Sequence, residues 1–309
     1  MPVPLMPTNI LNTQLSTVIS TMRLPFLILT PICVLLGVSS VAGISALLSI
    51  YVWLVFAGAL LAHVSVNMLN EYQDFKSGLD LVTDRTPFSG GSGGLPDNPQ
   101  AAPAVLSGAL IALVGVIFIG FLLAVQYPLL WILGVIGSLI ILTYTQHINR
   151  IPWLCVIAPG VGFGLLMVAG AAIVAGDIAG HELSMICAAL LAFFMVNNLL
   201  LANQFPDIKA DAEHGREHLL IKYGTVAGVK VYGVTTLLAG LTIVISVIFD
   251  VWTPWALLAL LPWALTLKTW VALNSLKENI AQQPEALGLN VVATLLTPLV
   301  VSVTLLVVT

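Results

Sequence analysis

Charged residues are scarce in this sequence. Asp, Glu, Lys and Arg make up only 8% of its 309 residues, whereas 59% of the residues are hydrophobic. A soluble domain usually carries about a quarter charged residues, and the mean hydropathy of this chain is +1.06. Because so few charges cannot cover a surface that faces water, the composition excludes an ordinary soluble domain. It predicts an integral membrane protein whose main partner is the lipid bilayer.

Cysteines and basic clusters are scarce as well. The three cysteines, Cys33, Cys155 and Cys187, lie far apart within apolar runs and form no C-x-x-C pair. We interpret them as reduced, buried thiols rather than as disulfides or metal ligands. No run of Lys and Arg has the density of a nucleic-acid-binding patch, so no nucleic-acid partner is expected.

Long apolar runs take up most of the chain. A helix needs roughly 20 apolar residues to cross the hydrocarbon core of a bilayer, and nine runs approach that length. They cover residues 23–42, 44–70, 102–125, 128–148, 151–176, 183–205, 226–249, 251–272 and 286–308. Since helices satisfy their own backbone polar groups in lipid, we expect an all-α integral membrane protein with about nine transmembrane helices in a single bundle. Residues 1–309 then form one transmembrane domain, with residues 1–22 as an amphipathic segment on the membrane surface.

Two connections between these runs, residues 71–101 and 206–225, are long and polar. If the N-terminus is cytoplasmic and all nine runs span, every Lys and Arg falls on the cytoplasmic side, as the positive-inside rule favours. These residues are Arg23, Lys76, Arg85, Arg150, Lys209, Arg216, Lys222, Lys230, Lys268 and Lys277. We therefore expect a multi-pass protein of the inner or plasma membrane whose N-terminus, two active-site loops and active-site cavity face the cytoplasm.

The second polar connection begins with a regularly spaced set of oxygen-bearing side chains. Asn203, Asp207 and Asp211 follow i, i+4, i+8 spacing. If the preceding helix continues past the membrane, this spacing keeps all three side chains on one narrow stripe.

A second stripe of this kind begins the first polar connection. Its members follow i, i+3, i+4, i+7 spacing and are Asn67, Asn70, Glu71 and Asp74. Asp80 lies beyond them, past Gly78, where a turn would bring Asp80 back toward the stripe.

Carboxylates that share a stripe repel one another unless a cation lies between them. Hard oxygen ligands suit Mg²⁺, which takes one or two carboxylates and completes its shell with water and substrate phosphate. Two such stripes at one membrane boundary predict a two-walled site for Mg²⁺ and a diphosphate. Basic side chains that could neutralise the phosphate charge follow closely in sequence: Lys76, Arg85, Lys209, Arg216 and Lys222. The alternative is that both stripes are solvated helix ends with ordinary surface charge.

These two motifs resemble those of the UbiA superfamily of intramembrane aromatic prenyltransferases. The second motif reads Asp207-Ile-Lys-Ala-Asp211, and the first runs from Asn70 through Asp74 to Asp80, with Gly78 where many members have their last Asp. This version is most similar to the 1,4-dihydroxy-2-naphthoate polyprenyltransferase branch, which makes demethylmenaquinone in menaquinone biosynthesis. Further features that fit this branch are Arg23-Leu-Pro before the first span, Tyr144-Thr145, and Gly162-Phe163-Gly164. Departures from its pattern are Glu71, His218 and the glycine-rich residues 85–95.

The resemblance implies roles for the candidate residues. Mg²⁺ is held by Asp74, Asp80, Asp207 and Asp211, of which Asp74, Asp207 and Asp211 are the catalytic carboxylates. The diphosphate of a polyprenyl donor is bound by Asn70, Lys76, Arg85, Asn203, Lys209 and Arg216. The allylic carbocation that remains is attacked by an electron-rich aromatic carbon, within apolar walls that hold the prenyl tail and exclude water.

Several assignments stay open at this point. Tyr72, Tyr144 and Phe163 are candidates to face the acceptor or the carbocation through their rings, with packing as the alternative. His147, His214 and His218 are either solvated or a base for the acceptor proton. Residues 89–94, Ser-Gly-Gly-Ser-Gly-Gly, are a phosphate cradle, a lid or a plain flexible linker.

The acceptor and the class of protein also have alternatives. Acceptors other than the naphthoate are 4-hydroxybenzoate, homogentisate, a tetrapyrrole or a glycerol phosphate. An ion-coupled transporter would place its coupling carboxylates near the bilayer midplane, whereas the acids here lie at span ends. A membrane protein without chemistry would not need two carboxylate stripes.

Overall fold

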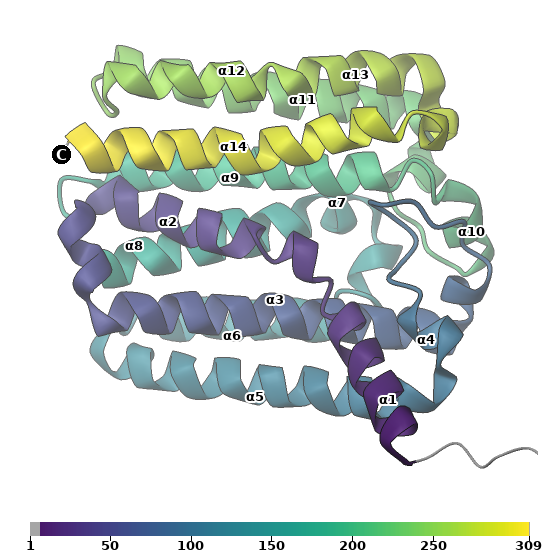
Figure 1. Cartoon of the computed structure of the whole chain (residues 1–309). Helices are drawn as coiled ribbons and strands as arrows, with labels where there is room; N and C mark the ends of the chain where they lie inside the picture. The colour runs from purple at the N-terminus through teal and green to yellow at the C-terminus, as the bar shows by residue number, and fades with distance from the viewer. Residues whose placement is uncertain (1–6, 309) are drawn as a thin grey trace, which may run out of the picture.

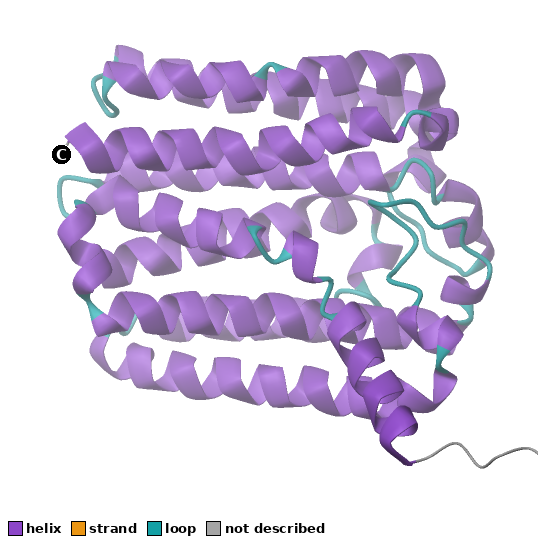
Figure 2. Ribbon diagram, viewed as in Figure 1, coloured by secondary structure: helices purple, strands orange, loops and turns teal. Residues whose placement is uncertain are grey.

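Every regular element in the part of the chain that the structure describes, residues 7–308, is a helix (Figures 1 and 2). The elements of the first half of this computed structural model are α1 (Pro7–Thr21), η1 (Leu24–Phe26), α2 (Leu29–Val41), η2 (Ile44–Leu48), α3 (Ile50–Ser77), η3 (Leu79–Leu81), α4 (Gly94–Asp97), η4 (Pro99–Ala101), α5 (Ala102–Gln126), α6 (Leu130–Thr143) and η5 (Ile148–Arg150). Those of the second half are α7 (Pro152–Gly160), η6 (Val161–Val168), α8 (Ala169–Ala175), α9 (Glu182–Asn203), α10 (Ile208–Glu213), α11 (Leu219–Ile248), η7 (Pro254–Ala259), α12 (Leu260–Trp263), α13 (Leu265–Leu276), η8 (Lys277–Gln282) and α14 (Pro284–Val308).

Candidate membrane spans confirm the expected all-helical membrane protein, although their number is lower than nine. Within the described residues, seven helices are long and apolar enough to cross a bilayer, or eight if one bent pair counts as a span. That pair, Thr13–Phe26 and Leu29–Val41, bends by 44°, so the expected span at 23–42 is broken near its start. The expected span at 128–148 contains only α6, a helix of 14 residues, which is shorter than roughly 20 residues that a bilayer needs.

The N-terminal segment that we expect to be amphipathic lies partly outside the described residues, since its first six residues are not among them. The rest forms α1. Thr17 and Thr21 are buried against the bundle, whereas Leu15 and Ile19 are exposed. One side of the helix therefore packs against the protein, and the other side exposes apolar side chains.

Helix α9 is the most deeply buried of the candidate spans and contacts α2, α7, η6, α11 and α14. Its close contact with the span α7–η6–α8 depends on two glycines, Gly160 and Gly164. A Cβ at Gly164 would lie 2.5 Å from the Phe193 backbone nitrogen, and the Gly160 amide donates a hydrogen bond to Asn197 Oδ1 at 2.6 Å. Small residues spaced by four let two membrane helices approach closely, so these glycines fix the position of the α7 end of the bundle.

The middle of the α7–η6–α8 span is a π-helix, η6. One-turn widenings of this kind are rare and occur frequently at functional sites. Here the π-helix follows Pro159, which cannot donate the backbone hydrogen bond that a regular helix needs. It brings Gly162 and Phe163 into the wall of the cavity described below.

The two polar connections gather at one end of the bundle. Figure 1 shows α1, α4 and α10 at the right-hand end, where α3 and α9 end and α7 and α11 begin. Because antiparallel helices return the chain to the same end, segments far apart in sequence meet there. This end holds the candidate site.

Candidate active site

A cavity of about 410 Å³ runs from this end into the bundle. Apolar side chains of α3, α6, η6 and α9 line its interior, and polar side chains gather at its mouth. The mouth includes Asn67, Asn70, Asp74, Asp80, Ser89, Asn149, Asn203, Asp207, Asp211, Arg216 and His218. A site with a charged mouth and an apolar interior matches a ligand that is charged at one end and apolar at the other.

The cavity brings most of the sequence-predicted residues together. Those that line it are Asn70, Asp74, Asp80, Tyr144, Phe163, Asn203, Asp207, Asp211 and Arg216. Four others do not line it. Lys76, Arg85 and Lys209 are exposed on the surface, and Tyr72 packs against the apolar cluster of α3 and α5 around Met68 and Val105.

The first wall of the mouth is the end of α3, as the spacing predicts. Asn70 Nδ2 donates hydrogen bonds to Asp74 Oδ2 at 2.9 Å and to Thr145 Oγ1 at 3.1 Å. The helix ends at Gly78, whose φ of 87° is a left-handed conformation that glycine adopts without strain. This turn returns Asp80 to the cavity, as expected from the sequence.

The second wall departs from the expected geometry. Helix α9 ends at Asn203, and the chain turns through Pro206 before α10 begins at Ile208. The expectation of one continuous helical stripe is therefore wrong, because a proline lacks the amide that a continuing helix needs. The turn nevertheless leaves Asn203, Asp207 and Asp211 all facing the cavity.

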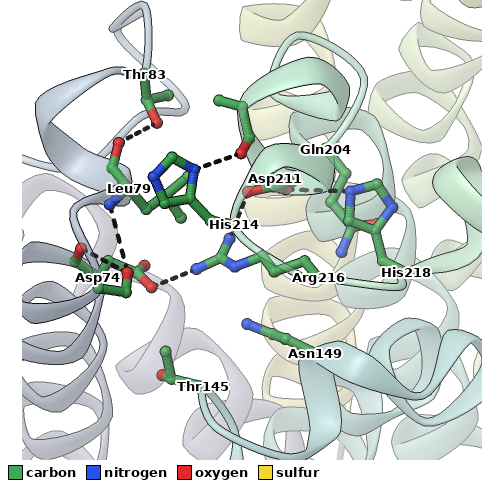
Figure 3. Close-up of polar contacts among 12 residues, drawn as sticks. Asp74, Leu79, Thr83, Thr145, Asn149, Gln204, Asp211, His214, Arg216 and His218 are labelled. Carbon is green, nitrogen blue, oxygen red and sulfur yellow. Dashed lines mark hydrogen bonds and ion pairs between the residues drawn. The ribbon is translucent and has the colours of Figure 1, made fainter.

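Arg216 joins the two walls. Its Nη2 lies 2.5 Å from Asp74 Oδ1 and its Nη1 lies 2.9 Å from Asp211 Oδ1, so it lies between the two carboxylates in Figure 3. Burial by itself lowers the pKa of Arg216, but the charges of Asp74 and Asp211 outweigh it and raise that pKa above its usual value. Arg216 is therefore a fixed positive charge at the mouth of the cavity. His218 Nε2 lies 3.1 Å from the other oxygen of Asp211.

Four buried oxygens of residues that line the cavity have no hydrogen-bond partner among the described residues: Asp80 Oδ2, Asn203 Oδ1, Gln204 Oε1 and Asp207 Oδ1. Burial raises the pKa of the Asp80 carboxyl to about 8, with further contributions from the charges of Asp74 and Glu71. Burial and the charge of Asp211 raise the pKa of Asp207 to about 7, although hydrogen bonds from the Ser89 side chain and the Gly90 backbone offset part of this rise. Buried carboxylates without partners are unfavourable, so this arrangement is suited to receive a positive charge.

The donor set fits a divalent cation that shares its coordination with a ligand. Carboxylate and amide oxygens are the atoms that Mg²⁺ prefers, and the four unpartnered oxygens are of these types. Asp74 and Asp211 are already paired with Arg216. Among residues 7–308, no group of three or more His, Cys, Asp or Glu side chains is close enough to hold a metal ion. Substrate oxygens and water would have to complete the shell.

The glycine-rich residues 89–94 cover the mouth. The backbone amide of Ser92 donates to Glu71 Oε1 at 2.8 Å, and its hydroxyl donates to Glu71 Oε2 at 2.7 Å. Gly91, with a φ of 74°, lies so close to Asp80 that a Cβ would be 3.0 Å from its Oδ1. The interpretation as a plain flexible linker is therefore wrong, because both oxygens of a buried carboxylate hold the loop against the site. Glu71, the departure from the first motif, has this anchoring contact.

Sequence reasoning missed several residues of the cavity wall, notably Arg23, His63 and Asn149 as site residues. One signal was present for His63, since it precedes Asn67 by four residues and so continues the stripe of the first motif. Arg23 lies at a break between two helices with a φ of 56°, and Pro25, two residues further on, is a sequence signal of that break.

Comparison with solved structures shows the same fold in other proteins. A UbiA homologue from Archaeoglobus fulgidus bound to DMAPP and Mg²⁺ is 15% identical, with a TM-score of 0.62 over 95% of this chain and 100% of that chain. The homologue bound to GPP and Mg²⁺ is 14% identical, with a TM-score of 0.63 over 94% and 99%. A structure of digeranylgeranylglyceryl phosphate synthase is 18% identical, with a TM-score of 0.63 over 95% and 99%.

Comparison of the sequence with curated proteins gives no match. The model of the UbiA prenyltransferase family, however, matches residues 28–290. This range contains both carboxylate motifs, Arg216 and every helix from α3 to α13. The chain therefore belongs to the UbiA prenyltransferase family.

Proposed function

We propose that this protein transfers a polyprenyl group from its diphosphate to an aromatic acceptor, with Mg²⁺ holding the diphosphate at the mouth of the cavity. The observation that carries this proposal is the set of unpartnered buried oxygens on Asp80, Asn203 and Asp207, at the charged end of an otherwise apolar cavity. The binding of DMAPP or GPP with Mg²⁺ by the Archaeoglobus fulgidus homologue supports a prenyl diphosphate and Mg²⁺ as the ligands.

The proposed metal ligands are Asp74, Asp80, Asp207 and Asp211, with Asn70 and Asn203 assisting. When bound, Mg²⁺ supplies positive charge that stabilises the leaving diphosphate. Asp74 and Asp211 become available to it as Arg216 turns from these carboxylates toward the phosphate oxygens, to which a guanidinium donates two hydrogen bonds. Asp74, Asp207 and Asp211 are thus the carboxylates on which transfer depends.

The chemical step that we propose is an electrophilic alkylation of an aromatic ring. The bond between the donor C1 and its diphosphate oxygen breaks, and the electron pair leaves with the diphosphate. An aromatic carbon forms the new bond to C1. It then releases a proton to the diphosphate or to water or, if it is the carbon that carries the carboxylate of 1,4-dihydroxy-2-naphthoate, it releases CO₂; either loss restores the aromatic ring. Apolar walls exclude water that would quench the cation, and Tyr144 and Phe163 offer ring faces to it.

The remaining predicted residues receive narrower roles in this proposal. Lys76, Arg85 and Lys209 are exposed and outside the cavity, so we assign them to attracting the anionic donor to the mouth rather than to binding it. We assign Tyr72 to packing because it contacts the α3–α5 cluster.

The proposal also includes the identity of the acceptor and the orientation of the protein in the membrane. We favour 1,4-dihydroxy-2-naphthoate, and so a step of menaquinone biosynthesis, because the first motif has the form Asn70, Asp74, Gly78, Asp80. We place the mouth in the cytoplasm because the exposed basic residues Lys76, Arg85 and Lys209 lie at that end of the bundle.

The test is a transfer assay in membranes that contain the protein. It uses Mg²⁺, a labelled long-chain prenyl diphosphate and a panel of the naphthoate, 4-hydroxybenzoate and homogentisate, with Asp207→Asn beside the wild type. Mg²⁺-dependent product that the variant loses is the expected result. Product with another acceptor would change the pathway and retain the mechanism. Folded protein that gives no product with any acceptor would contradict the proposal.

A further inference from the structure

A histidine lies in the apolar part of the cavity wall, among side chains that are mostly apolar. His63 is on α3 and lines the cavity. With Asn67, Asn70 and Asp74 it follows i, i+4, i+7, i+11 spacing, so all four residues share one face of the helix. At a rise of roughly 1.5 Å per residue, His63 lies about 10 Å beyond Asn70 along the helix axis and about 16 Å beyond Asp74.

Two other elements hold the His63 ring in place. Its Nδ1 lies 2.8 Å from the hydroxyl of Thr30 at the start of α2, and Thr30 is completely buried. The Phe163 ring of the π-helix η6 meets the imidazole edge-on, with ring centroids 4.7 Å apart at 79°. The position of the second ring nitrogen, Nε2, is therefore fixed as well.

The hydrogen bond to Thr30 also indicates which nitrogen carries the proton. Within the described residues, the Thr30 hydroxyl has no hydrogen-bond partner other than His63. If Nδ1 donated to Thr30, the buried hydroxyl proton would have no acceptor, which is unfavourable. We therefore assign the hydroxyl as the donor to Nδ1, which leaves the proton of a neutral ring on Nε2.

His63 Nε2 has no partner among the described residues, although the side chain is only 5% exposed and lines the cavity. Leaving a polar N–H in apolar surroundings is unfavourable, and a residue kept only for packing could be a phenylalanine or leucine. A prenyl tail consists of carbon and hydrogen only, so it would not satisfy this donor. An aromatic acceptor has oxygen substituents that would.

We propose that His63 donates a hydrogen bond from Nε2 to an oxygen of the aromatic acceptor and so selects which acceptor is prenylated. The proposal rests on the function proposed above, since it presupposes an acceptor in the cavity beside the donor. The reacting ring carbon lies toward the mouth, and the bound oxygen lies on the opposite side of the ring. Thr30 is a positioning residue that orients the imidazole.

The test compares steady-state KM values for acceptor and donor in His63→Phe, which keeps an aromatic ring against Phe163 and removes both nitrogens. With 1,4-dihydroxy-2-naphthoate and geranylgeranyl diphosphate as probes, we expect the acceptor KM to rise on the order of tenfold while the donor KM stays unchanged. Thr30→Val should raise the acceptor KM by less. His181→Phe is the matched control, because His181 is exposed and outside the cavity, and it should change neither value.

A second readout separates recognition from a general structural effect. The wild type should prefer the naphthoate over 1-naphthol, which lacks two of its oxygen substituents, and His63→Phe should lose most of this preference. A changed donor KM, or a changed preference between donors of different chain length, with an unchanged acceptor KM would overturn the proposal, because His63 would then line the tail groove.

Folding and the proposed function are controlled separately. If His63→Phe does not fold, His63→Gln retains an N–H donor and should keep part of the naphthoate preference. If the wild type transfers no prenyl group at all, the proposed function has failed. Naphthoate binding can then be measured directly, by the shift in Tm that it causes in the absence of donor. A shift in the wild type that His63→Phe reduces supports the His63 site, and equal shifts overturn it.

Discussion

Two polar clusters are buried in this apolar bundle, and they differ in how well their hydrogen bonds are satisfied. The inner cluster joins α9, α11 and α14 and consists of Asn198, Tyr232, Thr235, Thr236 and Asn290. Asn198 donates to Thr236 at 2.8 Å, Tyr232 donates to Asn290 at 2.8 Å, and Asn290 returns a bond to the Asn198 carbonyl at 3.2 Å. The mouth cluster, in contrast, leaves oxygens of Asp80, Asn203 and Asp207 without partners.

The difference distinguishes polar residues that stabilise the fold from polar residues that are available to bind a ligand. A satisfied polar network inside a protein makes the packing of its helices specific, whereas an unsatisfied one costs stability. The inner cluster gains nothing from a ligand, since each of its members has a protein partner. The mouth cluster, in contrast, gains stabilising interactions when a cation or a phosphate binds. Variants in the two clusters should therefore affect different properties.

The largest effect is expected from the mouth carboxylates. Asp207→Asn and Asp74→Asn should each lower the rate of prenyl transfer by roughly 10²- to 10³-fold, because the leaving diphosphate loses charge stabilisation. Thermal unfolding in detergent should change little in Asp207→Asn, whereas Asp74→Asn also loses its ion pair with buried Arg216 and should unfold at a lower temperature. Asp177→Asn, at an exposed position outside the cavity, is the control and should retain full activity. Wild-type rates for both mouth variants in excess Mg²⁺ would contradict the assignment.

The inner cluster should show the opposite behaviour. Tyr232→Phe removes the hydrogen bond to Asn290 and should lower the stability of the protein by about 1 kcal/mol, as interhelical hydrogen bonds in membranes do. The KM values for both substrates should stay unchanged. Tyr223→Phe at an exposed position controls for the substitution. A specific increase in donor KM without loss of stability would show that the two clusters do not divide their roles in this way.

The pH dependence of stability should also differ between the clusters. An aspartate in an unfolded chain has a pKa near 3.9, whereas Asp80 and Asp207 titrate at about 8 and about 7 in the folded protein. The folded state therefore holds these protons more tightly, and its stability falls as the pH rises through those values. In the absence of Mg²⁺, the Tm should fall as the pH rises from about 4, near the unfolded pKa, to about 8, the folded pKa of Asp80, and it should fall less steeply in Asp80→Asn. A Tm with the same pH profile in both proteins would contradict the raised pKa values.

The smallest effect is expected at the loop that covers the mouth. Glu71→Gln keeps one acceptor for Ser92 and loses the charge, so the glycine-rich segment should be held less firmly. We expect the donor KM to rise by a few fold, since a hydrogen bond to a charged group contributes about 1.5–3 kcal/mol and half of this anchor remains. Glu213→Gln, an exposed acid outside the cavity, is the control. An unchanged donor KM would indicate that the loop needs no anchor.

The sequence predicted the membrane-helical class and most of the mouth because both follow from local patterns. Apolar runs of sufficient length predicted the spans, and helical spacing predicted that Asn70 and Asp74 share a face with a turn back to Asp80. The break in the second motif was missed because the i, i+4, i+8 spacing suggested a helix through Pro206.

The parts of the site that were not predicted depend on long-range contacts. Arg216 pairs with Asp74, 142 residues away in the sequence, and only the fold brings the loop after α10 to the end of α3. His63 has a role only because α2 and η6 bring Thr30 and Phe163 to its ring. A single histidine within an apolar run carries no such information. Lys76, Arg85 and Lys209 are likewise exposed outside the cavity, although they are close in sequence to residues that line it.

The most direct test of the account measures the Tm of detergent-purified protein with Mg²⁺, with the unreactive analogue geranyl S-thiolodiphosphate, and with both together. The unpartnered oxygens of Asp80 and Asp207 predict that both ligands together raise the Tm of the wild type far more than either alone, by linkage between binding and folding. Asp80→Asn and Asp207→Asn should lose this joint effect, and Tyr232→Phe should keep it. Equal stabilisation of all four proteins, or none in the wild type, would contradict a metal and diphosphate site at the mouth.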